Sequence, residues 1–178
     1  MHLKHLKSIP LAGLLLTALA SPALAAAAAS HCDIALDVTD YDPKGLNVRS
    51  APDAKSNVVA VLKQQGDWVE VHVTGQSGQW YAIDEATVYD NNLPTGEKIV
   101  FKGHGFVHGS KIGGSGLGGG TLVYDRPDEK TGKPIKWDDE YDDDVKVLAC
   151  SGTWAKVQAK KAIVWSNAVC TNTLTTCS

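Results

Sequence analysis

Short hydrophobic runs divided by turn residues make up the chain after residue 30. In the run WVEVHVT, Val69, Val71 and Val73 fall on one face of an extended segment, while Glu70 and His72 fall on the other. Runs of this kind recur about every ten residues, with Gly, Pro, Asn and Asp between them, and none shows a helical period. The pattern predicts an all-β protein made of small barrels or sandwiches.

The stretch LNVRSAPD, residues 46–53, shows how one of these runs ends. Leu46 and Val48 share a face and are expected to point into a core. The turn that follows cannot continue the ladder, because proline lacks an N–H and Asp53 can accept bonds from backbone amides beyond it. We expect Arg49 on the outer face, as a partner of a carbonyl or a carboxylate rather than of a ligand.

The same order of runs occurs twice along the chain. NVRSAPDAK matches LVYDRPDEK, and WVEVHVTGQSGQW matches DVKVLACSGTW. Trp80 follows Pro52 by 28 residues, and Trp154 follows Pro127 by 27. Because the motifs recur at nearly constant spacing, the sequence predicts a duplicated unit. Recurrence of the tryptophan favours a packing role for it over a ligand-binding role.

A run of glycines separates the two copies. Residues 111–121, KIGGSGLGGGT, are mostly glycine, and ordering such a segment costs much conformational entropy. The sequence therefore predicts a linker at 113–120 between a first domain at 31–112 and a second domain at 121–178. A phosphate-binding loop is not expected, because no Gly-Lys-Ser or Gly-Lys-Thr follows the glycines.

Residues 1–25 have the composition of a signal peptide. Lys4 and Lys7 precede the apolar run LAGLLLTALA, and Ala23 and Ala25 suit a peptidase that cuts after small residues. A membrane anchor needs about 20 continuous apolar residues with a basic flank after them, so we expect no membrane span in the mature protein. The predicted location is the periplasm or the cell exterior.

Four cysteines follow the predicted leader, and an even number in an oxidising compartment favours two disulfides. Three pairings are possible, and the sequence favours Cys150 with Cys170. A metal site is the weaker alternative, because no two cysteines are separated by only two residues. The four positions are Cys32, Cys150, Cys170 and Cys177.

The charge pattern excludes nucleic acid as a partner. The formal net charge is −3, and no cluster of Lys and Arg is present to neutralise phosphates. His104 and His108 would lie about 13 Å apart along an extended strand, too far to share one metal ion. They are expected to be strand-edge histidines, and no metal or cofactor is expected.

One acidic segment, WDDEYDDD, stands out as a candidate partner site. A solvated loop is the plainest interpretation, since like charges repel and prefer water. A basic protein could instead dock on it with the two aromatic residues as anchors, or a cation could bind, although the EF-hand spacing is absent. The segment consists of Trp137, Asp138, Asp139, Glu140, Tyr141, Asp142, Asp143 and Asp144.

Three other aromatic residues are candidates for a ligand groove. Tyr41 falls in the loop before the LNVR run, and Trp68 and Tyr81 fall at the edges of predicted strands. The alternative is that these side chains are half-buried packing residues.

Several segments together resemble the bacterial SH3-like domain family. LNVRSAP, VVAVLKQQGDWVEV, GQW and GFVHGS are similar to its opening, central and closing strands over residues 37–112, with Phe106 where the family usually has Trp. The second copy is degenerate, because TLVYDRP lacks the Asn and Arg of the opening. The resemblance implies two small barrels of five or six strands in tandem and, in many relatives, a targeting role towards peptidoglycan or proteins.

These patterns favour a non-catalytic envelope protein that recognises a cell-wall peptide or an envelope protein. An alternative is an inhibitor or immunity-type protein that binds a secreted or basic enzyme through the acidic loop 138–144. A small hydrolase is a third possibility, but the sequence contains no Gly-x-Ser-x-Gly motif and no evident nucleophile with its base.

Overall fold

The protein is all-β, as its hydrophobic pattern predicts. The computed structural model describes fourteen strands and one short 3-10 helix over residues 30–64, 66, 68–118, 122–137, 145–159 and 162–171. The predicted signal peptide 1–25, the acidic residues 138–144 and Cys177 lie outside these described residues.

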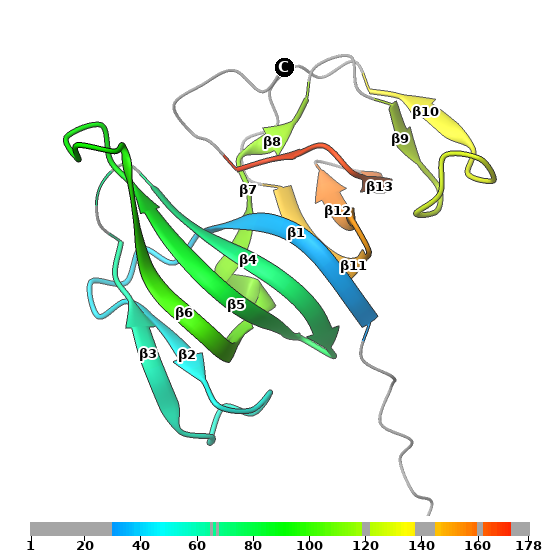
Figure 1. Ribbon diagram of the computed structural model, residues 1–178. Coiled ribbons are helices and arrows are strands. Elements are labelled where there is room, and N and C mark those ends of the chain that lie inside the picture. Colours follow the sequence, from blue (N-terminus) through cyan, green and yellow to red (C-terminus); the bar gives the residue numbers. More distant parts are fainter. Residues whose placement is uncertain are drawn as a thin grey trace, which may run out of the picture.

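The strands form two sets of seven, which we call unit 1 and unit 2 (Figure 1). Unit 1 contains β1 (Ser30–Val38), β2 (Leu46–Arg49), β3 (Val58–Leu62), β4 (Trp68–Ser77), β5 (Trp80–Tyr89), β6 (Glu97–His108), the 3-10 helix η1 (Gly109–Lys111) and β7 (Ile112–Gly114). Unit 2 contains β8 (Gly116–Leu117), β9 (Leu122–Tyr124), β10 (Pro134–Lys136), β11 (Val145–Ser151), β12 (Trp154–Ala159), β13 (Ala162–Ser166) and β14 (Val169–Cys170).

The order of strands in the sheet reveals the duplication. Twelve strands are hydrogen-bonded in the order β10-β9-β13-β12-β11-β7-β1-β4-β5-β6-β2-β3. Read from either edge, the first five strands are equivalent, because β3, β2, β6, β5 and β4 correspond to β10, β9, β13, β12 and β11. The remaining pair, β8 with β14, corresponds to β1 with β7. The order in which the strands pair therefore repeats in the two units, as the sequence motifs do.

The registers of the two units agree as well. Ser77 pairs with Trp80 across a two-residue hairpin loop, and Ser151 pairs with Trp154 in the same way. The first loop residues, Gly78 and Gly152, have φ angles of 60° and 54°, as the common two-residue hairpin turn requires. Further along, Arg49 pairs with Phe106 and Tyr124 pairs with Trp165.

The glycine-rich segment differs from the flexible linker that its composition predicts. β7 pairs with β1 on one side and with β11 on the other, so the two units share one continuous open sheet whose edges are β10 and β3. A Cβ atom on Gly113 would lie 2.8 Å from the Val145 carbonyl oxygen, and one on Gly114 would lie 2.8 Å from the Cys170 oxygen. These glycines are needed because neighbouring backbones approach closely.

The predicted pairing of Cys150 with Cys170 is wrong, because Cys150 forms its disulfide with Cys32. The bond joins β1 to β11, where the backbone N of Asp33 also donates to the Gly152 oxygen at 2.8 Å. Cys170 lies instead on β14, opposite Gly116, and is disulfide-bonded as well. The error arose because proximity along the chain says little about proximity across a sheet.

Local predictions for the first unit are confirmed. Val69, Val71 and Val73 are fully buried, and Leu46 and Val48 lie in the same core. Arg49 is half-buried and donates from Nη1 to the Ser56 carbonyl oxygen at 2.7 Å, which is the structural role expected of it. The Lys55 amide donates to Asp53 Oδ1 at 2.9 Å, as predicted for the turn.

Replacing Gly114 by alanine should disturb the junction between the units. The added methyl group would meet backbone and the Val169 side chain, and overpacking of this kind costs about 1–3 kcal/mol. In hydrogen exchange, the loss of protection should centre on β7, β8, β11 and β14. Gly96→Ala is the matched control, since a Cβ at Gly96 meets nothing within 4 Å and only the positive φ of 75° is strained. Unchanged protection around Gly114 would mean that the segment is a flexible linker after all.

Candidate ligand clefts at the junction

The aromatic residues predicted to form a ligand groove do not share one surface. Tyr41 is 74% exposed, whereas Tyr81 is 1% exposed and alternates with Ile83 on the core face of β5. The Tyr81 ring packs so closely on Gly109 that a side chain there would not fit. The expectation of a surface position for Tyr81 is therefore wrong.

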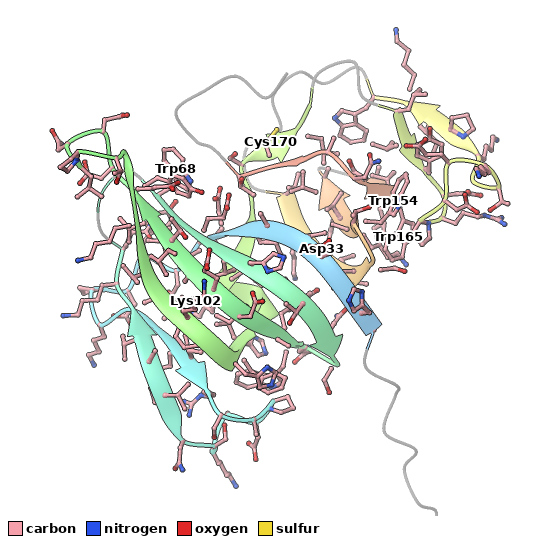
Figure 2. All side chains as sticks on the ribbon, viewed as in Figure 1. Asp33, Trp68, Lys102, Trp154, Trp165 and Cys170 are labelled. Atoms are coloured by element: carbon pink, nitrogen blue, oxygen red, sulfur yellow. A yellow bond between two sulfur atoms is a disulfide. The ribbon has the colours of Figure 1, made fainter. Side chains whose placement is uncertain are left out.

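Trp68 and Trp137 are largely packing residues. Trp68 is half-buried at the end of β4 remote from the β4–β5 hairpin, and its ring stacks on Tyr89 with centroids 4.7 Å apart (Figure 2). Trp137, expected as an exposed anchor for a partner, is 8% exposed. The neighbouring candidates Asp138, Asp139, Glu140, Tyr141, Asp142, Asp143 and Asp144 lie outside the described residues.

A cleft of about 190 Å³ opens where the β4–β5 hairpin of unit 1 faces β11 of unit 2. We call it the first cleft. Side chains and backbone from both units line it, so it exists only because the units are joined. Its lining residues are Gln76, Gly78, Gln79, Tyr81, His108, Gly109, Ser110, Lys146, Val147 and Leu148.

The amide of Gln76 fixes the two walls of the first cleft. Its Nε2 donates to the Leu148 carbonyl oxygen at 3.2 Å and to the Gly78 oxygen at 2.9 Å. Its Oε1 accepts from the Cys150 amide at 3.2 Å. Leu148 is the extra residue of a bulge in β11, and such bulges reorient the backbone locally. The Cys32–Cys150 disulfide adds a covalent link beside these bonds.

His108 is oriented by the turn that follows it. Its Nδ1 accepts from the Ser110 amide at 3.3 Å and lies 2.8 Å from Ser110 Oγ. Since Nδ1 accepts, the ring proton of the neutral imidazole belongs on Nε2. The ring also meets Trp80 edge to face, with centroids 5.2 Å apart. The contact with Ser110 is therefore a cap of η1, with Nε2 left as a donor.

Tyr81 and Lys146 determine the chemistry of the first cleft. The Tyr81 hydroxyl is buried without a hydrogen-bond partner among the described residues, and burial raises the pKa of Tyr81 to about 12. The hydroxyl stays protonated at neutral pH and retains a free donor. Lys146, exposed on β11, supplies a positive charge, and no carboxylate is among the described residues that line the cleft.

A second cleft of about 210 Å³ occupies the corresponding place in unit 2. Thr153, Ala155 and Asn167 stand there where Gln79, Tyr81 and His108 stand in unit 1, and β1 supplies the facing wall. Its described lining residues include no positive side chain. The lining consists of Asp33, Ile34, Ala35, Leu36, Thr153, Ala155, Ser166, Asn167, Val169 and Thr171.

His72 forms a cluster that the sequence did not predict. Its Nε2 lies 2.9 Å from Asp33 Oδ1 on β1, and its Nδ1 lies 2.7 Å from Asp84 Oδ1 on β5. Both aspartates sit where the strand register shifts, so bulges direct them at the ring. The hydrogen bond to Asp33, followed by that to Asp84, raises the pKa of His72. Because both ring nitrogens are bound, His72 joins three strands and is not a free base.

Asp37 is a buried acid at the junction. It is 5% exposed, and neither carboxyl oxygen has a hydrogen-bond partner among the described residues. Burial, and then the charge of Glu70 opposite it on β4, raises the pKa of Asp37 to about 8. Asp37 is therefore protonated at neutral pH.

No family model, curated protein or solved structure matches the chain. Among the described residues, no group of three or more His, Cys, Asp or Glu side chains is placed to hold a metal ion. The same part of the chain contains no helix long and apolar enough to span a membrane.

Asp37→Asn should change how stability depends on pH. In the wild type, the unfolded chain ionises Asp37 above about pH 4 while the folded protein keeps it protonated up to about pH 8. Unfolding therefore releases a proton, and this residue makes the free energy of unfolding fall as pH rises from 4 to 8. Urea denaturation across this range should give a flatter curve for the variant, with higher stability than wild type at pH 8.

The exposed Asp42 provides the control for this measurement. Asp42→Asn should leave the slope between pH 4 and pH 8 close to that of the wild type. If Asp37→Asn and Asp42→Asn give the same slope, Asp37 ionises normally in the folded protein and the assignment is wrong.

Proposed function

We propose that the protein is a non-catalytic binding module of the bacterial envelope, and that a cell-wall peptide or a segment of an envelope protein occupies the first cleft. The observation that carries the proposal is the cleft between the units, whose lining includes Lys146 and Tyr81, the latter with a buried hydroxyl that has no hydrogen-bond partner among the described residues. Unpaired buried polar groups are costly, and a ligand that bonds to them gains affinity.

Two features support an SH3-like origin for each unit. Each starts with a strand that pairs with the last strand of the same unit, and each contains the same five-strand order. Together with the LNVRSAP and GFVHGS segments, this repetition favours two SH3-like domains joined through the shared strand β7. Modules of this class commonly act by binding rather than by catalysis.

The disulfide between the units supports export of the protein to an oxidising compartment. The Cys32–Cys150 disulfide joins residues separated by 118 positions, and such bonds persist in oxidising compartments. This agrees with the signal peptide expected at residues 1–25 and with a periplasmic or secreted location.

Binding also explains the His108–Ser110 contact better than hydrolysis does. A serine nucleophile needs a histidine base that a third group orients through its other nitrogen. Here Nδ1 accepts a hydrogen bond from the Ser110 amide at a local turn, and no carboxylate is among the described residues that line the cleft. The pair therefore suits ligand recognition.

Cosedimentation with purified sacculi tests the proposal. The mature protein should sediment with sacculi, and Gln79→Trp should reduce the bound fraction about tenfold or more by filling the first cleft. Thr153→Trp is the matched control, because Thr153 occupies the same hairpin position beside the second cleft. Circular dichroism would confirm that both variants are folded.

Sacculi with and without their attached proteins separate the two ligand classes. Binding to both preparations supports a wall peptide, and binding only where proteins remain supports an envelope protein. A wild-type protein that sediments with neither contradicts the proposal, as does equal loss in the two tryptophan variants.

A further inference from the structure

We infer that the first cleft recognises a free carboxylate at the C-terminal end of a peptide. This inference rests on the proposed function and specifies the chemical group that the cleft takes. Such an end is present on wall stem peptides and on envelope proteins, so the shared group is the terminal carboxylate.

The first step concerns charge. Although the chain has a formal net charge of −3, the described residues that line the first cleft include Lys146 and no carboxylate. An anionic group is therefore attracted to Lys146 at this position.

The second step concerns hydrogen-bond donors. The Gln76 amide is already committed, since its nitrogen donates twice and its oxygen accepts once within the junction. Of the lining residues, His108 keeps Nε2 as a donor, Tyr81 carries a hydroxyl with no hydrogen-bond partner among the described residues, and Lys146 carries an ammonium group. A carboxylate has two oxygens and accepts up to four such bonds, which matches a cleft with an excess of donors.

The third step concerns size. The volume of about 190 Å³ is below the roughly 300–1,000 Å³ of pockets that enclose a drug-sized ligand. The rigid walls, held by Gln76 and the disulfide, do not spread easily to admit more. The end of a chain fits such a cleft better than a segment that passes through it.

The two clefts differ in the residues that would bind a carboxylate. The second cleft has Ala155 in place of Tyr81, and its facing wall on β1 carries Asp33, whereas the facing wall of the first cleft on β11 carries Lys146. We therefore assign carboxylate recognition to the first cleft alone.

Calorimetric titration with N-acetyl tri-alanine peptides tests the inference. The peptide with a free carboxylate should bind the mature protein, and the same peptide with a C-terminal amide should bind about tenfold to a hundredfold more weakly. A D-alanine end represents the wall stem peptide, and an L-alanine end represents a protein terminus. The preferred enantiomer identifies the source of the ligand.

Three variants locate the binding. Lys146→Gln should weaken binding of the free acid about fivefold, whereas Lys98→Gln on β6, outside the cleft, should leave it unchanged. Tyr81→Phe should weaken binding without lowering stability, because it removes a buried hydroxyl that has no partner among the described residues. A purely structural role for Tyr81 would reduce stability and affinity together.

The outcomes separate the inference from the proposed function. Equal affinity for acid and amide, with both blocked by Gln79→Trp, overturns carboxylate recognition and leaves the proposed function standing. Binding to sacculi without binding to any of the peptides does the same. Failure to bind peptides and sacculi alike overturns both.

Discussion

Pairing of β7 with both β1 and β11 is the constraint on which the rest of the molecule depends. Gly113 is the register partner of Asp37 on β1 and of Lys146 on β11. The buried acid and the lysine of the first cleft are therefore positioned by the same residue. Because a Cβ atom at Gly113 would meet the Val145 oxygen, only glycine allows the strands to approach this closely. The position of the first cleft therefore depends on the pairing of β7 with β1 and β11.

The junction is also where the two units stop being equivalent. In unit 1, β1 pairs with both β4 and β7. In unit 2 the strand corresponding to β4 is β11, and its free side pairs with β7 of unit 1 instead of with β8. The duplicated units thus complete one another's sheet, and the cleft walls come from different copies.

The features predicted from the sequence are those that depend on neighbours in the chain. Alternating valines, the Arg49 turn and the repeated tryptophan all follow from patterns of two to thirty residues. The Cys32–Cys150 bond and the His72 cluster escaped prediction because they join strands distant in sequence, with bulges at Asp33 and Asp84 that no local motif marks. The glycine-rich segment was predicted to be a linker because glycine is typical both of flexible segments and of strands whose backbones approach closely.

The residues of the candidate site likewise depend on contacts between strands that are distant in the sequence. Tyr81 was a candidate from the sequence for its expected exposure, yet the structure buries it in the lining of the first cleft and leaves its hydroxyl with no hydrogen-bond partner among the described residues. Nothing in the sequence around Lys146 marks it as a candidate, because its role depends on the hairpin of unit 1 that it faces across the cleft.

Comparison of the two clefts gives a physical reason why the proposed binding site lies in the first cleft and not in the second. The hairpin that presents Gln79 in unit 1 presents Thr153 in unit 2, and the position of Tyr81 is taken by Ala155. Gln76, whose amide holds the first cleft open, corresponds to Cys150, whose sulfur is bound to Cys32. The disulfide that stabilises the junction thus occupies the position that the second cleft would need for an equivalent amide clamp. One residue at this position can either form the disulfide that stabilises the junction of the two units or supply an amide to a second site. In this chain it forms the disulfide.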